Sequence, residues 1–216
     1  MKLIFCVMSL LWTFNAHAAS LESIVPRPFA EPPASYKLQQ NYEFLDPQNL
    51  IRKPLLLKAL KFHEFNFARF RNPDFISLID FSIRAGLPRY FLLNMKTGEV
   101  KAMLTAVGSG SDPDGDGLAN SFSNIADSHQ SSLGFYLTDD EYVGSNGRSL
   151  RLHGLNSTNS NALKRAIVVH GAPYVSELDQ HAGRSHGCPA VDLKNIDALI
   201  DQIKDGSLMF TAYQNI

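Results

Sequence analysis

Short apolar runs separated by turn residues dominate the chain from residue 75 onward. Lys96-Thr97-Gly98 lies between two of these runs and is typical of a hairpin turn. We find no repeat with a period of about 20–50 residues, the spacing of repeat proteins. The pattern therefore predicts a β-rich α+β domain, with candidate strands at 76–81, 89–95, 99–107, 133–143, 149–152, 166–170 and 208–213.

Two segments have the spacing of helices instead. Residues 53–72 begin with Lys53-Pro54, where proline suits the first turn, and carry many apolar side chains up to Phe70. We expect this helix to pack on the domain. Residues 192–204 place apolar side chains on one stripe, Asp192 can cap the segment, and Gly206 can end it.

The N-terminus has the organisation of a secretory signal peptide. Lys2 precedes an apolar run from Leu3 to Phe14, and Ala16-His17-Ala18 matches a cleavage site. The run is shorter than the roughly 20 residues that span a membrane. We therefore interpret 1–18 as a cleaved signal, with no stable membrane span afterwards, 19–52 as a proline-rich segment, and 73–216 as the main domain.

The charge composition argues against a nucleic-acid-binding protein. The chain has 216 residues, 20 Lys and Arg against 21 Asp and Glu, and a net charge of -1. It lacks the basic excess of a nucleic-acid-binding protein.

Of its two cysteines, Cys6 would leave with the signal peptide, so that Cys188 would remain as a lone thiol. In an oxidising compartment such a thiol is tolerable when it is inert or necessary.

The surroundings of Cys188 favour a necessary thiol. A nucleophilic cysteine needs a base or cation, an exposed turn, and backbone N–H groups that stabilise an oxyanion. His170 ends an apolar segment as a candidate base, and Gly171 allows a sharp turn after it. Gly187 allows a strained turn before Cys188, where the N–H groups of both residues could form the oxyanion pocket.

These residues resemble the motif of the YkuD-type L,D-transpeptidases, cysteine enzymes that remodel bacterial peptidoglycan. The shared elements are His-Gly at 170–171 and Ser-His-Gly-Cys at 185–188, with Cys188 eighteen positions after His170. Residues 131–136 are similar to the family's upstream Thr-Pro-x-Gly-x-Phe stretch. Ala190 stands where family members usually carry Arg or Asn, which resembles a divergent branch, the murein L,D-transpeptidase catalytic domain-like proteins. The resemblance covers 76–213 and implies the family's catalytic fold of mixed β-sheets with a few helices.

The resemblance also implies a reaction. Cys188 would attack the bond between meso-diaminopimelate and D-Ala in a tetrapeptide stem, release D-Ala, and pass the acyl group to an amine. His170 would act as base and then acid, oriented by a backbone carbonyl near Gly171. His186 matches a third catalytic position. Peptidoglycan stem peptides would be the partners, no metal or organic cofactor is expected, the location would be the periplasm or cell envelope, and carbapenems would acylate the thiol.

Substrate-binding candidates surround this motif. The Arg184 guanidinium can pair with a carboxylate through two hydrogen bonds. Ser185 and Tyr174 are further candidates. His153, in a second His-Gly pair, could face the same cleft, although its distance from Cys188 makes His170 the preferred base.

Other readings remain open. With water as acceptor the same site would be an L,D-carboxypeptidase or amidase, and a protein that binds murein without turnover is another alternative. A zinc-dependent peptidase could use His170, His181, His186 and Cys188. Finally, Asp112, Asp114, Asp116 and Gly117 match the first half of a calcium loop, but its twelfth position is Ser123 rather than Glu.

Overall fold

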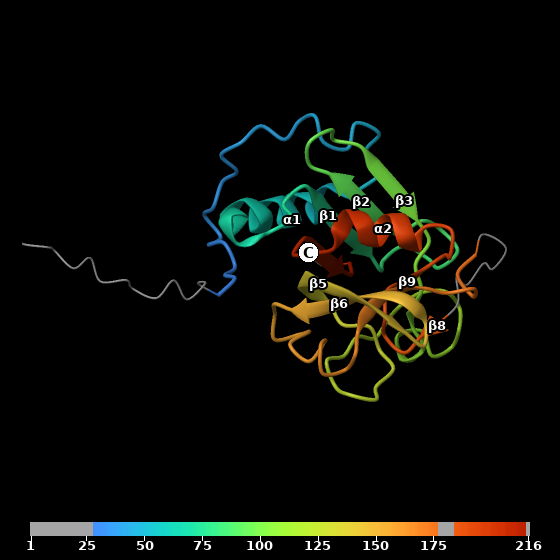
Figure 1. The fold of residues 1–216 in the computed structure, drawn as a ribbon. Helices are drawn as coiled ribbons and strands as arrows, with labels where there is room; N and C mark the ends of the chain where they lie inside the picture. Colours follow the sequence, from blue (N-terminus) through green and yellow to red (C-terminus); the bar gives the residue numbers. More distant parts are fainter. Residues whose placement is uncertain (1–27, 177–183, 215–216) are drawn as a thin grey trace, which may run out of the picture.

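A mixed β-sheet of eight strands forms the centre of the molecule in a computed structural model that describes residues 28–176 and 184–214. The strand order is β3-β2-β1-β10-β5-β6-β7-β9, and β4 and β8 form a separate pair. Figure 1 shows β2 and β3 side by side above α2 (Ile196–Ile203), and β5 and β6 side by side below it. Neighbours in the large sheet are antiparallel except β1 with β10 and β7 with β9. The strands are β1 (Phe75–Asp80), β2 (Tyr90–Asn94), β3 (Val100–Met103), β4 (Val107–Gly108), β5 (Gly134–Gly144), β6 (Gly147–Gly154), β7 (Val168–Gly171), β8 (Arg184–Ser185), β9 (Ala190–Val191) and β10 (Leu208–Ala212).

Two helices cover the central strands and create two cores. Alternate residues of β1 point to opposite faces of the sheet, as in any strand. Ile76 packs in the core that contains α1 (Lys53–Phe65), and Ile79 packs in the core that contains α2 (Ile196–Ile203). Because both faces are covered, β10 is buried along its whole length. This arrangement confirms the prediction of a β-rich α+β fold.

Both helices are shorter than the sequence predicts. The first helix ends at Phe65 because the side-chain nitrogen of Asn66 donates to the carbonyl oxygens of Phe62 and Ala30, and only a 3-10 turn, Phe67–Arg69, follows. The second helix begins at Ile196, after a turn in which the Asp192 carboxylate accepts the Asn195 N–H.

The predicted strand 99–107 is split between two sheets. The Thr105 hydroxyl and the Ala106 N–H both donate to the Ala190 carbonyl, each at 2.9 Å. These bonds draw the chain away from β2 after Met103. The next residues then pair with β8, the strand that leads into Cys188.

The segment before α1 lies along that helix. The Glu64 carboxylate accepts hydrogen bonds from the Tyr36 hydroxyl and from the Gln39 and Gln40 N–H groups. Phe29 packs against the rings of Phe62 and Phe70. Among the described residues, no helix combines the length and the apolar character needed to cross a membrane. The predicted signal peptide, 1–18, lies outside the described residues.

His63 on α1 predicts a loss of stability in acid. Burial lowers the pKa of His63 from 6.5 to about 4, so the unfolded chain binds this proton more readily than the folded chain. The stabilising free energy is complete above pH 6.5 and falls by about 3 kcal/mol as the pH drops to 4. His63→Phe should flatten this slope in urea unfolding at pH 7, 6, 5 and 4.5. Parallel pH dependences for the wild type and the variant would contradict the prediction.

Candidate active site

His170 lies on β7 with one ring nitrogen fixed. Its Nδ1 is 3.0 Å from the Gly171 carbonyl oxygen. Because a carbonyl only accepts hydrogen bonds, Nδ1 carries the proton and Nε2 is left as the basic nitrogen. Burial lowers the pKa of His170, and the bond to Gly171 opposes that shift. The imidazole is therefore neutral near pH 7 and able to accept a proton.

Gly171 has a different structural role from the one its sequence position predicts. It continues β7 by pairing with Val191 instead of turning the chain. A Cβ atom at this position would lie 2.9 Å from Ile196 and 3.0 Å from Leu193. Glycine at this position therefore leaves room for the side chains of Leu193 and Ile196, at the start of α2.

The turn that carries Cys188 is shaped by Ser185 and Gly187. The Ser185 hydroxyl accepts the Gly187 N–H at 3.1 Å and donates to the Cys188 carbonyl at 2.7 Å. Gly187 has a φ of +115°, and a Cβ atom there would lie 2.6 Å from the Gln130 carbonyl oxygen. The Gly187 N–H is occupied by Ser185, which leaves the Cys188 N–H as the candidate oxyanion donor of the two predicted from the sequence.

Residues 131–136 include a serine that hydrogen-bonds to this turn. The Ser131 hydroxyl donates to the Gly187 carbonyl at 3.3 Å and accepts the Gly108 N–H at 3.0 Å. The Ser132 and Tyr136 hydroxyl groups are 2.7 Å apart in the buried interior. The stretch singled out by its sequence resemblance therefore holds the nucleophile turn in place.

The Cys188 thiol is partly exposed and free of any disulfide. Its Sγ is 3.6 Å from the carbonyl oxygen of Ala166, a residue with a strained φ of 53°. Burial raises the pKa of the Cys188 thiol, and a backbone hydrogen bond from Val168 and the charge of Arg165 oppose that rise. The sulfur is thus protonated near pH 7 and depends on a base for activation.

Arg165 is a cation near Cys188 that sequence reasoning missed. Its Nη1 donates to the Ser123 carbonyl at 2.7 Å and its Nη2 to the Gln130 carbonyl at 2.6 Å. A Cβ atom on Gly187 would lie 3.2 Å from the same Nη2. Arg165 lies outside the recognised motif. Its position just before the apolar run of β7 is the one sequence signal that could have indicated it.

The buried position of Ala190 explains why no charged residue stands two positions after Cys188. It is fully buried in a small apolar cluster with Leu104, Ala106, Ala172 and Val175. It also pairs with His170 in the parallel register of β7 and β9. A long charged side chain has no room at this position, and the charge near the thiol comes from Arg165 instead.

Two of the predicted histidines have other partners. The exposed ring of His186 stacks on His129, with ring centroids 4.1 Å apart and an angle of 3° between the planes. His153 Nε2 is 2.5 Å from the Asp139 carboxylate on β5, a contact that lowers the pKa of Asp139. The structure therefore places His153 in a hydrogen bond with Asp139, and its role as a substrate-binding residue stays a prediction.

Arg184 and the aspartate loop contact each other. Arg184 Nη1 donates to the Asp112 carbonyl at 2.9 Å. One carboxylate oxygen from each of Asp112, Asp114 and Asp116 lies within 4.8 Å of the others, the one such group of potential metal ligands among the described residues. The Ser123 hydroxyl, at the twelfth loop position, accepts the Ile125 N–H instead of turning to the loop. His181, which the zinc alternative requires, lies outside the described residues.

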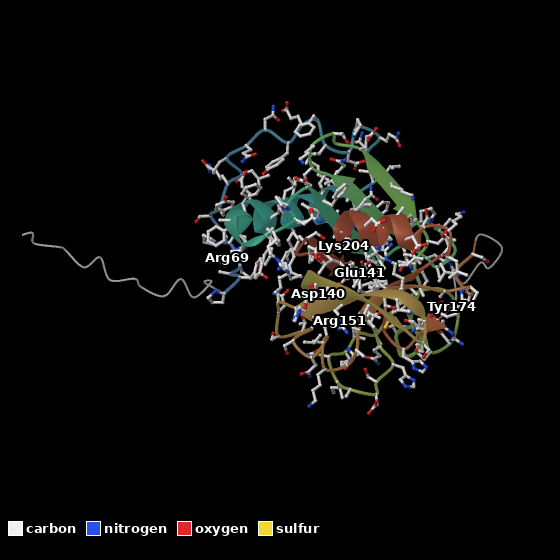
Figure 2. The ribbon with its side chains drawn as sticks, viewed as in Figure 1. Arg69, Asp140, Glu141, Arg151, Tyr174 and Lys204 are labelled. Carbon is white, nitrogen blue, oxygen red and sulfur yellow. The ribbon has the colours of Figure 1, made fainter. Side chains whose placement is uncertain are left out.

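Tyr174 follows β7 and lies near the thiol. Burial raises the pKa of its phenol, and the charge of Cys188 adds to that rise. Figure 2 shows Tyr174 on the side of the molecule where β8 runs, away from Glu141 and Lys204. The structure thus brings Cys188, His170, Ser185, Gly187, Arg165 and Tyr174 into one neighbourhood.

Comparison with solved structures finds proteins of low sequence identity, with L,D-transpeptidases among them. An L,D-transpeptidase from Mycobacterium smegmatis is 14% identical, with a TM-score of 0.41, 64% of this chain covered and 58% of the other. The helical cell shape determining protein Pgp2 from Campylobacter jejuni is 14% identical, with a TM-score of 0.43, 66% of this chain covered and 48% of the other. This chain therefore spans about half to three fifths of the length of these proteins.

Comparison with family models gives a match over most of the chain. No curated protein sequence matches it. The model of the L,D-transpeptidase catalytic domain matches residues 49–213 and so includes α1, which the motif resemblance over 76–213 left out. With this match, the chain belongs to the L,D-transpeptidase catalytic domain family.

Proposed function

We propose that this protein is a peptidoglycan-modifying L,D-transpeptidase whose nucleophile is Cys188. His170 Nε2 takes the thiol proton as sulfur attacks the carbonyl carbon between meso-diaminopimelate and D-Ala. The same nitrogen returns that proton to the departing D-Ala amine, which leaves a thioester on Cys188. An acceptor amine then attacks the thioester and restores the thiol, so that atoms and protons balance over the cycle.

The observation that carries this proposal is the fixed tautomer of His170. The bond from Nδ1 to the Gly171 carbonyl frees Nε2 as a base, while β7 and β9 place His170 beside the strand that follows Cys188. A base with a lowered pKa next to a protonated thiol fits general-base activation rather than a preformed ion pair. The Cys188 N–H is proposed as the oxyanion donor, with the Ser185 hydroxyl holding the turn.

The proposal also concerns where the reaction takes place and which acceptor takes the acyl group. The N-terminal sequence supports export to the periplasm or cell envelope, where stem peptides occur. Water in place of the amine would turn the same thioester chemistry into an L,D-carboxypeptidase. The experiment below separates these outcomes.

Incubation of the purified chain without its first 18 residues with tetrapeptide and pentapeptide muropeptides tests the proposal. We expect loss of D-Ala from the tetrapeptide and, with an amine acceptor, a cross-linked dimer, both read by mass spectrometry. Activity should survive a chelator and be lost on alkylation of Cys188. The reverse pattern would support the zinc-dependent alternative, and binding without any product would support a non-catalytic murein-binding protein.

Arg165→Gln should slow acylation by roughly tenfold, because the positive charge near Cys188 lowers the cost of forming a thiolate. The measurement is the rate of iodoacetamide alkylation against pH, which reports the titration of the thiol. We expect the curve to move to higher pH in Arg165→Gln and to return most of the way in Arg165→Lys. Coincident curves for the wild type and Arg165→Gln would contradict this role.

A further inference from the structure

A cavity adjoins the segment that contacts the Cys188 thiol. Its volume is about 190 Å³, and it lies beside β5, β6 and the start of β7. Two of its lining residues also belong to the surroundings of the thiol, since Cys188 Sγ contacts the Ala166 carbonyl and a hydrogen bond from the Val168 backbone reaches the sulfur. The lining residues are Tyr142, Arg151, Leu163, Ala166, Ile167 and Val168.

The sheet register places this cavity on the same face as His170. Arg151 is paired with Val168, and Ser149 with His170, between β6 and β7. Directly opposed residues of antiparallel strands project on the same face. Arg151 is therefore two residues, about 7 Å, along the strands from the pair that contains the proposed base.

Arg151 brings a positive charge that its surroundings do not neutralise. Its guanidinium carbon lies 4.2 Å from the centroid of the Tyr142 ring, a cation–π contact. Within residues 28–176 and 184–214, no carboxylate forms an ion pair with Arg151. By contrast, Arg148 on the same strand binds Glu141, Asp197 and Asp201. Figure 2 shows Arg151 beside β6.

The chemistry of the cavity indicates its ligand. A guanidinium that contacts an aromatic ring can still donate its N–H groups, and these match the two oxygens of a carboxylate. Leu163, Ile167 and Val168 provide an apolar wall next to that charge. Such a site fits a short aliphatic chain that ends in a carboxylate.

We propose that Arg151 and Tyr142 form a subsite for the side-chain carboxylate of meso-diaminopimelate in the donor stem. This inference rests on the proposed function, because it takes the acyl donor to be a stem peptide. Arg151 is then a specificity-determining residue that selects stems with a free carboxylate over stems in which the same group is amidated.

The test compares two synthetic tetrapeptide stems that differ in that carboxylate, free or amidated. Release of D-Ala without acceptor reports the donor step alone. We expect the wild type to prefer the free acid by about tenfold or more in kcat/KM, the size of a charge-assisted hydrogen bond. Arg151→Gln should bring this ratio close to one, mainly through a higher KM for the free acid, and Arg151→Lys should restore part of it.

Matched variants guard against unfolding and unspecific charge effects. Lys101→Gln removes one exposed positive charge from β3, at the opposite edge of the sheet, and should keep the ratio of the wild type. Tyr142→Leu removes the ring that contacts the guanidinium and should lower the preference. A ratio that stays unchanged in Arg151→Gln would overturn the inference while leaving the proposed function intact.

A binding measurement keeps the inference testable even without turnover. Cys188→Ala, titrated with both stems by calorimetry, should bind the free acid more tightly, and adding Arg151→Gln should remove that difference. If the wild type releases no D-Ala but this difference is observed, the subsite stands and the proposed function fails. Equal affinity for both stems, or no binding of either, would overturn the subsite.

Discussion

Replacement of Cys188 by alanine is expected to abolish covalent acylation while leaving the fold intact. The thiol is partly exposed and donates only a long hydrogen bond of 3.6 Å to Ala166, so its loss removes little packing. The reaction, however, has no other described thiol to form the thioester. Intact-protein mass spectrometry after incubation with a carbapenem or a tetrapeptide stem should show the adduct for the wild type and the unmodified mass for Cys188→Ala.

The control for this prediction is Ser185→Ala. It keeps the thiol but removes the hydroxyl that joins the Gly187 N–H to the Cys188 carbonyl. We expect slower acylation with a normal final adduct mass, because the nucleophile is present but its turn is less ordered. An adduct of unchanged mass on Cys188→Ala would show that another group is the nucleophile.

Replacement of His170 by alanine should slow acylation by roughly 100- to 10,000-fold, the usual contribution of a positioned general base. Because burial lowers the pKa of His170 below its ordinary value of 6.5, the midpoint of the wild-type acid limb should lie below that pH. The variant should lack this acid limb, since no imidazole is left to be protonated. Rapid-mixing measurements of acylation between pH 4.5 and 8 provide the comparison.

His153→Ala serves as the matched control for His170→Ala. His153 belongs to the second His-Gly pair but is bonded to Asp139 on β5. Its loss should leave the acylation rate within about twofold and the acid limb in place. A large loss in His153→Ala together with a near-normal rate in His170→Ala would move the role of the base to His153.

The sequence predicted most of the elements because their signals are local. Short apolar runs identified β1 and β10, and Lys96-Thr97-Gly98 identified the hairpin between β2 and β3. Where the sequence failed, long-range contacts decided. Asn66 ends α1 because its side chain binds Ala30, 36 residues earlier, and the strand at 99–107 divides because Thr105 and Ala106 bind Ala190.

The candidate site shows the same division. Spacing between His170 and Cys188 predicted a candidate catalytic pair, but Arg165 has no motif and becomes significant only because the loop folds it against Gly187. Spacing also left His153 as a candidate, and only the structure shows that it is bonded to Asp139 across β5 and β6. Such contacts join residues through pairing of strands, which sequence separation does not reveal.

The sequence by itself predicted the candidate chemistry of this protein: a thiol at Cys188, a histidine at the motif spacing, and a glycine that permits the turn before the cysteine. These depend on residue type and short-range backbone geometry. Only the tertiary structure decided which ring nitrogen of His170 is the base, which cation lies near the sulfur, and that Arg151 faces a cavity on the side of the proposed base. The physical reason is that hydrogen bonds, charges and cavities act over a few ångströms in space, whatever the distance along the chain.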